Sequence, residues 1–127
     1  MLDMFRRHAF AEAGAGAELV VNATGGNVSL DALADVDLDG KVLLDVANPL
    51  DFSAGFPPTL TVKDTDSLAE QLQRAFPTAR VVKSLNTVNA AVMVDPGHLP
   101  AESTIFVAGD DAAARALVRG LLVELGW

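Results

Sequence analysis

Apolar residues gather in four short runs that polar and glycine-containing turns separate. Each run is rich in Val, Leu or Ile and only a few residues long, which is typical of buried strands. The four predicted strands are Glu18–Ala23, Lys41–Ala47, Arg80–Leu85 and Thr104–Ala108.

Helical patterns lie between these runs. The clearest begins at Ser67-x-x-Glu70, a capping box, and carries an apolar stripe as far as Pro77. A second follows Asp110, which is expected to cap it, and ends at Gly126. Weaker helices are predicted over Phe10–Ala17 and Ser29–Leu33, whereas the Gly- and Pro-containing segment Leu50–Thr61 is expected to be a loop.

Strands that alternate with helices indicate an α/β fold with a mostly parallel sheet. We therefore expect about four strands, with helices flanking both faces of the sheet. The direction of the outermost strand stays open, because Thr87–Ser103 holds at most a short helix. That strand either continues the parallel order or turns back antiparallel.

Composition narrows the class of protein. A chain of 127 residues fits one domain, and the absence of cysteine excludes disulfides and thiolate metal sites. The formal charge of -8 disfavours nucleic acid and anionic membranes as partners. No apolar run approaches the roughly 18 residues of a membrane span, and Met1–His8 lacks the apolar core of a signal peptide. We expect a cytoplasmic protein in which residues 1–8 form a disordered lead-in.

Candidate binding residues follow the first three predicted strands. Ligands of open α/β sheets bind beyond the carboxyl ends of the strands, where small and amide-bearing residues suit a flat polar ligand. The turns there are Asn22-Ala23-Thr24-Gly25-Gly26, Asn48-Pro49 and Asn86-Thr87. The alternative is that these residues simply end the strands, as Gly, Asn and Pro commonly do.

Other motifs fail on context. Gly14-Ala15-Gly16 precedes a strand, whereas a dinucleotide fingerprint follows one. Asp35-x-Asp37-x-Asp39-Gly40 matches half of an EF-hand loop, but Val46 stands where the bidentate Glu belongs. Helix capping explains Gly109-Asp110-Asp111, and neither histidine has a motif around it. We therefore predict no metal ligands and no catalytic acid, base or nucleophile.

Several segments in order resemble the NADPH-dependent coenzyme F420 reductase family, which includes many predicted dinucleotide-binding proteins. The resemblance extends from about Ala9 to Trp127. The segments that carry it are Glu18–Thr24, Lys41–Phe52, Phe56-Pro57-Pro58-x-Leu60, Val81–Ala90, Thr104–Ala112 and Leu125-Gly126-Trp127.

The resemblance implies a Rossmann-like, doubly wound domain in which hydride passes between NADP(H) and coenzyme F420 or a similar deazaflavin acceptor. By position it implies that Asn22, Ala23, Thr24, Asn48 and Pro49 bind the dinucleotide. It places Ser84, Leu85, Asn86 and Thr87 beside the acceptor, which is the substrate. Hydride transfer asks the protein mainly for alignment, which agrees with the absence of a predicted catalytic residue.

The chain departs from the family at both ends. Members open with a strand and G-x-G-x-x-G and continue beyond the counterpart of Trp127, so we expect residues 1–127 to form a single truncated NAD(P)-binding domain. Two alternatives to an active oxidoreductase follow: an inactive relative, and a non-catalytic binding or oligomerisation module that forms a defined homo-oligomer. For these residues alone we favour inactivity, and for their descent we favour the reductase family.

Overall fold

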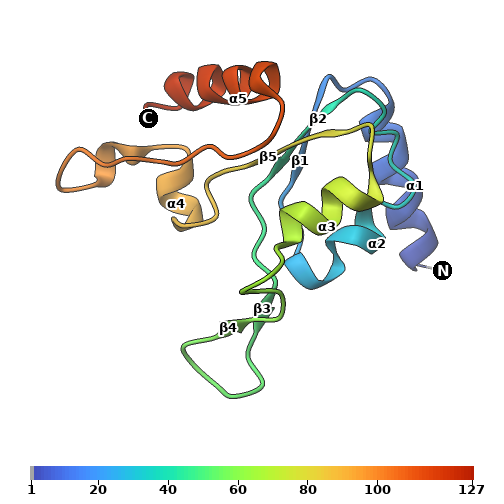
Figure 1. The fold of residues 1–127 in the computed structure, drawn as a ribbon, viewed down its shortest axis with the longest axis horizontal. Helices are drawn as coiled ribbons and strands as arrows, with labels where there is room; N and C mark the ends of the chain where they lie inside the picture. The colour runs from blue at the N-terminus through green and yellow to red at the C-terminus, as the bar shows by residue number, and fades with distance from the viewer. Residues whose placement is uncertain (1) are drawn as a thin grey trace.

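A three-stranded parallel sheet forms the centre of the protein in the computed structural model, which describes residues 2–127 and, from residue 9 onward, their side chains (Figure 1). The strand order is β1-β2-β5, with β1 at Leu19–Asn22, β2 at Val42–Asp45 and β5 at Arg80–Lys83. The register pairs Leu19 with Val42 and Arg80 at one end, and Asn22 with Asp45 and Lys83 at the other. All four residues of β2 are buried, so β2 is the central strand.

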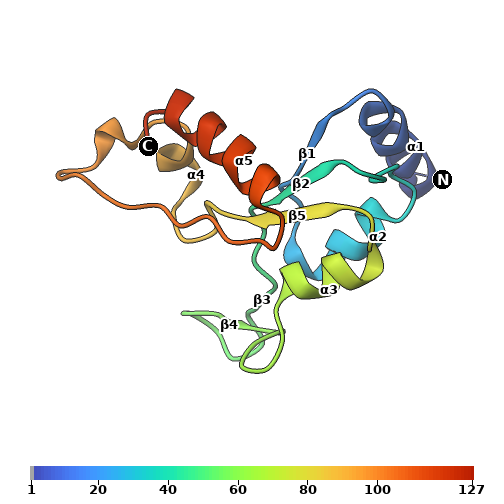
Figure 2. The same cartoon turned by 45° about the horizontal axis from the view of Figure 1, so that its top comes forward.

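Among the described residues, five α-helices flank the sheet or follow it along the chain. Their bounds are α1 Leu2–Ala15, α2 Ser29–Leu33, α3 Leu68–Ala75, α4 Ala90–Met93 and α5 Ala112–Glu124, and the short 3-10 helices are η1 Gly26–Val28 and η2 Pro96–His98. An antiparallel pair, β3 (Leu50–Asp51) with β4 (Thr59–Leu60), forms an arm that projects away from the sheet (Figures 1 and 2).

The two faces of the sheet carry separate apolar cores. On one face, Leu43 and Val81 pack with Leu68 and Leu72 of α3 and with Leu33 of α2. On the other face, Val42, Leu44 and Val82 pack with Val118 and Leu122 of α5. Figure 2 shows α2 and α3 on the opposite side of the sheet from α5. This α/β arrangement is a partial Rossmann-like fold, as predicted.

The three predicted parallel strands, the helix at Ser29–Leu33 and the capping box of α3 are confirmed. The fourth strand is reduced to a single antiparallel bridge between Lys83 and Ala108. Residues 104–108 thus turn back along β5. Phe106 in this segment is 77% exposed, so burial of apolar side chains contributes little to extending the ladder.

Three smaller expectations need correction. The segment Leu50–Thr61 contains the short β3–β4 pair and is not entirely a loop. Asp111, and not Asp110, caps α5, because its side chain accepts a hydrogen bond from the Ala114 N–H. The weak helix expected over Phe10–Ala17 is α1, which spans Leu2–Ala15 and therefore includes residues 2–8 of the expected lead-in. Met1 lies outside the described residues. None of the helices in the described part of the chain is long and apolar enough to cross a membrane.

Candidate functional site

A row of polar side chains crosses the sheet at the carboxyl ends of its strands. Asn22, Asp45 and Lys83 are register partners on β1, β2 and β5. The Asn22 Nδ2 donates to Asp45 Oδ1 at 2.9 Å, and the Lys83 Nζ donates to Asp45 Oδ2 at 2.8 Å. Each apolar strand therefore ends on a polar residue that is bonded to its neighbour.

Asp45 is the centre of this row. Its side chain is fully buried, and a buried carboxylate is costly unless charge and hydrogen bonds compensate it. The carboxylate accepts from Asn22, Lys83 and the Ala47 N–H, the last at 3.1 Å from Oδ1. These bonds connect the carboxyl end of β2 to both neighbouring strands.

The first turn is shaped by Asn22, which is only 1% exposed. Its Nδ2 also donates to the Ser29 Oγ at 3.0 Å, and its Oδ1 accepts from the Thr24 Oγ1 at 2.7 Å. Because both amide donors and the carbonyl oxygen are used internally, Asn22 holds Thr24 and α2 in place. Ala23 is exposed and Thr24 half-buried on the surface of this turn.

The second turn contacts the first through backbone alone. The Gly26 N–H donates to the Asn48 carbonyl at 3.2 Å. A Cβ on Gly26 would lie 2.4 Å from the Pro49 nitrogen, so only glycine fits this approach. Asn48 is half-buried, and Pro49 is buried.

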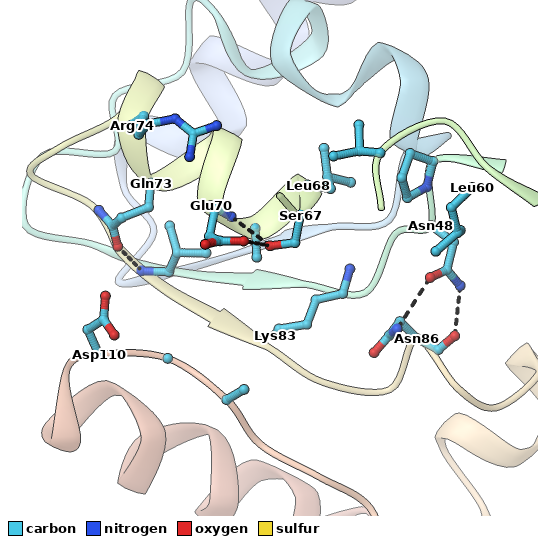
Figure 3. A pocket seen from close by; sticks show the side chains of 16 residues that line it. Asn48, Leu60, Ser67, Leu68, Glu70, Gln73, Arg74, Lys83, Asn86 and Asp110 are labelled. Carbon is cyan, nitrogen blue, oxygen red and sulfur yellow. Dashed lines mark hydrogen bonds between the residues drawn. The ribbon is translucent and has the colours of Figure 1, made fainter. Parts of the chain in front are cut away.

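The second and third turns are joined by a pair of amides (Figure 3). The Asn48 Nδ2 donates to the Asn86 carbonyl oxygen at 2.7 Å, and the Asn86 Nδ2 donates to the Asn48 Oδ1 at 3.3 Å. The turns that sequence reasoning placed at one edge are therefore linked in a chain from Gly26 to Asn86.

The third turn reverses sharply after β5. Leu85 has a φ of 63°, which is unusual for a residue with a Cβ, and its side chain is buried. Ser84 is 1% exposed and donates to the Phe106 carbonyl at 2.8 Å. Ser84 and Leu85 thus anchor the turn, whereas Thr87 is exposed on its surface.

A cavity of about 530 Å³ lies beside this edge, which is within the usual range for a small-molecule site. It is bounded by α3, β5, the 108–110 segment and the base of the β3–β4 arm (Figure 3). Its lining comprises Asn48, Pro49, Leu60, Val62, Ser67, Leu68, Ala69, Glu70, Gln73, Arg74, Val81, Lys83, Asn86, Ala108, Gly109 and Asp110.

The cations that line this cavity are already paired. Lys83 pairs with Asp45, and the Arg74 Nη2 lies 2.7 Å from the Asp66 Oδ2. The hydrogen bond from Arg74 is the main reason that the pKa of Asp66 lies below its ordinary value. With Glu70 and Asp110 also on the wall, the cavity favours an uncharged ligand group over a phosphate.

The predicted site residues divide between two hollows. Asn48, Pro49 and Asn86 line the cavity beside α3. Asn22 and Thr24 line a smaller hollow of about 260 Å³ between α1, α2 and β1. The hydrogen-bonded turns connect the two hollows, whereas Ala23, Ser84, Leu85 and Thr87 line neither of them.

Sequence reasoning missed Asp45 and Lys83. In the sequence each lies two residues before the end of a predicted strand, and the structure shows that the strands end at these two residues. In the Asp35–Gly40 segment, Asp37 accepts from the Asp39 N–H at 3.1 Å and pairs with Lys41 at 3.4 Å. No cluster of three or more metal-ligating side chains occurs in the part of the chain that the structure describes.

Comparison with known proteins gives two solved structures of interest. A protein from Arthrobacter sp. FB24, described as a "putative F420-dependent NADP reductase", is 58% identical over 92% of this chain, with a TM-score of 0.89. A hypothetical protein from Sinorhizobium meliloti is 28% identical over 92% of the chain, with a TM-score of 0.73. No protein-family model and no curated protein matches the chain.

The fold and the linked strand-end turns define part of a Rossmann-like domain with a candidate ligand site at one edge of its sheet. The 58% identity to the Arthrobacter protein supports the resemblance to the F420-dependent NADP reductase family. It spans 55% of the length of the Arthrobacter protein and 57% of that of the Sinorhizobium protein.

Proposed function

We propose that the turns after β1, β2 and β5 form part of an oxidoreductase site in which hydride passes between NADP(H) and coenzyme F420 or a similar acceptor. The observation that carries the proposal is the 58% identity to the Arthrobacter protein over 92% of the chain. The hydrogen bonds that join the turns support it, because hydride transfer depends on alignment of two ligands.

Within this proposal the predicted residues have two kinds of role. Thr24, Ala23, Asn48 and Pro49 present the surface toward the dinucleotide. Asn86 and Thr87 present the surface toward the acceptor, which is the substrate.

The other three members of the predicted set, Asn22, Ser84 and Leu85, are buried and act through these residues. Asn22 holds the first turn, and Ser84 and Leu85 hold the third. The proposal also includes a cytoplasmic location and a small-molecule partner instead of nucleic acid, which the charge of -8 and the lack of cysteine support.

Ligand titrations followed by NMR test this function. We expect millimolar NADPH to shift the backbone amide signals of Thr24, Asn48 and Asn86, and Asn48→Ala to abolish the shift at Asn86. Gln71→Ala, on α3 but outside the cavity lining, is the control and should leave the shifts intact. The absence of any shift at the three turns, with both NADPH and F420, would refute the proposed function.

The affinity should be low. The net charge of -8 repels the phosphates of NADPH, and the sequence offers no G-x-G-x-x-G after a strand to bind them. We expect a titration followed by nicotinamide fluorescence to give a Kd well above micromolar. Micromolar affinity would show that other residues of this chain bind the phosphates.

The second candidate function is a non-catalytic binding or oligomerisation module. It is favoured by the outer edge of β1, which pairs with no strand among the described residues, and by Val21 there, which is 49% exposed. Exposed strand edges readily pair with another chain. This candidate predicts a defined homo-oligomer and no shift at the turns with NADPH.

A further inference from the structure

The Lys83 ammonium lies at the junction of β5, β2 and the second turn. It donates to the Asp45 Oδ2 at 2.8 Å and to the Ala47 carbonyl oxygen. The side chain is 21% exposed and lies on the wall of the cavity (Figure 3). Lys83 therefore connects the cavity to the residue that immediately precedes Asn48.

Lys83 and Asp45 together hold both backbone polar groups of Ala47. The Asp45 Oδ1 accepts from the Ala47 N–H at 3.1 Å, while Lys83 donates to the Ala47 carbonyl. The carbonyl of Ala47 belongs to the peptide unit that leads into Asn48. Because that unit is planar, its orientation determines the direction in which the chain enters Asn48 after the end of β2.

Asn48 is the residue on which the linked turns depend. Its side-chain amide exchanges hydrogen bonds with Asn86, and its carbonyl accepts from the Gly26 N–H. A rotation of the Ala47–Asn48 peptide would therefore disturb the contacts to both neighbouring turns.

We propose that Lys83 is a positioning residue, which acts through Asp45 and Ala47 to fix the presentation of Asn48 toward the cavity. The inference rests on the proposed function only in taking Asn48 to contact the ligand. Lys83 need not touch a reacting atom, since two of its three ammonium donors are engaged within the protein.

If Lys83 served stability alone, a folded variant without it would keep the wild-type Asn48 and Asn86 signals. Removing one partner of a buried ion pair leaves an uncompensated charge, whereas replacing both partners is often neutral for stability. Lys83→Met is thus expected to lower stability. The double variant Asp45→Asn/Lys83→Met is expected to fold and yet to lack the bond to the Ala47 carbonyl.

The test measures the side-chain amide signals of Asn48 and Asn86 by NMR in the full chain. We expect these signals to move toward those of free amides in Lys83→Met and in the double variant. The amide signals of Ser67, which caps α3, and of Glu70 within α3 should stay unchanged in the double variant. Wild-type Asn48 and Asn86 signals in a folded double variant would overturn the proposal.

Lys41→Met is the matched control. Lys41 is also mostly buried, with 13% of its side chain exposed, and donates to the Gly14 carbonyl at 2.7 Å. It precedes β2 at the opposite end of the sheet, so its loss should leave Asn48 and Asn86 unchanged. An equal change in both variants would indicate a general loss of structure and would count against positioning.

Lys83→Arg decides the question should both Met variants unfold. The guanidinium keeps the charge but cannot place a compact ammonium at the same point. We expect it to fold with altered Asn48 and Asn86 signals, and unaltered signals would overturn the proposal.

The ligand measurement separates this inference from the proposed function. With NADPH, the folded Lys83 variants should lose the shift at Asn48 that the wild type shows. If the wild type itself shows no shift, the proposed function fails, but the amide signals without ligand still decide whether Lys83 positions Asn48.

Discussion

At the scale of single residues, Gly26 makes the closest backbone approach at the candidate site. It is buried against the peptide bond between Asn48 and Pro49, and a Cβ there would lie 2.4 to 2.5 Å from three backbone atoms. Backbone atoms of a turn that is held by Lys83 and Asn86 cannot easily yield. Glycine at this position therefore determines the spacing between the first and second turns.

Gly26→Ala should separate these two turns. We expect the free energy of unfolding to fall by about 1–3 kcal/mol, the usual cost of overpacking. The Gly26 N–H to Asn48 carbonyl bond should be lost as well. Chemical denaturation measures the first effect, and hydrogen exchange at residue 26 measures the second.

Gly120→Ala is the control for this prediction. Gly120 lies inside α5, and a Cβ there meets nothing within 4 Å. Alanine is the better helix former, so this variant should gain about 0.5–1 kcal/mol. A Gly26→Ala variant as stable as the wild type would show that the turns can move apart freely.

At the scale of elements, helix caps distinguish neighbouring acidic residues that the sequence presents as equivalent. Asp111 accepts from the Ala114 N–H at 2.6 Å, whereas Asp110 is exposed on the cavity wall. Position within the bend before α5 determines which carboxylate reaches the helix. The sequence Asp110-Asp111 offers both and cannot show that bend.

The two aspartates therefore make a matched pair of variants. Asp111→Ala should lower the free energy of unfolding by about 1 kcal/mol, because an N-cap hydrogen bond to α5 is lost. Asp110→Ala should change it by less than about 0.5 kcal/mol, as a surface substitution. Equal losses in thermal or chemical denaturation would contradict the observed cap.

Acid should weaken the start of α3. The hydrogen bond from Arg74, the Ser67 N–H and the Gln71 side chain keep the pKa of Asp66 below its ordinary value. A carboxylate with a lowered pKa in the folded state contributes stability above its unfolded pKa and loses it as pH falls through the folded value. Stability from this group should therefore decline below about pH 4.

Asp66→Asn tests this contribution. The variant should show a shallower decline in stability between about pH 4 and pH 2 than the wild type, measured by urea denaturation across pH. Asp35→Asn, an exposed aspartate away from α3, is the control and should keep the wild-type slope. An unchanged slope in Asp66→Asn would mean that solvent screens the pair with Arg74 completely.

The elements that sequence reasoning predicted well share one property, which is local determination. Three consecutive apolar residues, Val42 to Leu44, lead into Asp45 in β2, and the Ser67–Glu70 capping box forms with the Glu70 N–H 3.2 Å from the Ser67 Oγ. Residues 104–108 have an equally apolar pattern, yet only one bridge forms, because the pairing depends on how the chain returns from α4. The local pattern of apolar residues does not show how a chain returns to pair with a distant strand.

At the scale of the whole molecule, the predicted parallel topology indicated which turns share one edge of the sheet, but it did not indicate the hydrogen bonds that join them. Parallel strands bring Asn22, Asn48 and Asn86 to one edge, and that much follows from three apolar runs that end alike. The row from Asn22 through Asp45 to Lys83 depends on register, which pairs specific residues across strands 23 and 38 positions apart. A single sequence gives the strands but leaves their register open.

The outer edge of β1 makes a prediction about the molecule as a unit. Val21 is 49% exposed at this edge, beside an apolar hollow that Phe10 and Leu19 also line. An unpaired edge without charged side chains favours pairing with a second copy, and a lysine there opposes it. We therefore expect the apparent mass of the wild type in light scattering to rise with concentration, and Val21→Lys to shift it toward the monomer. Val123→Lys, on an exposed position of α5, is the control because it adds the same charge away from the edge. A wild type that stays monomeric at all concentrations would exclude self-association through β1 and with it the oligomerisation module.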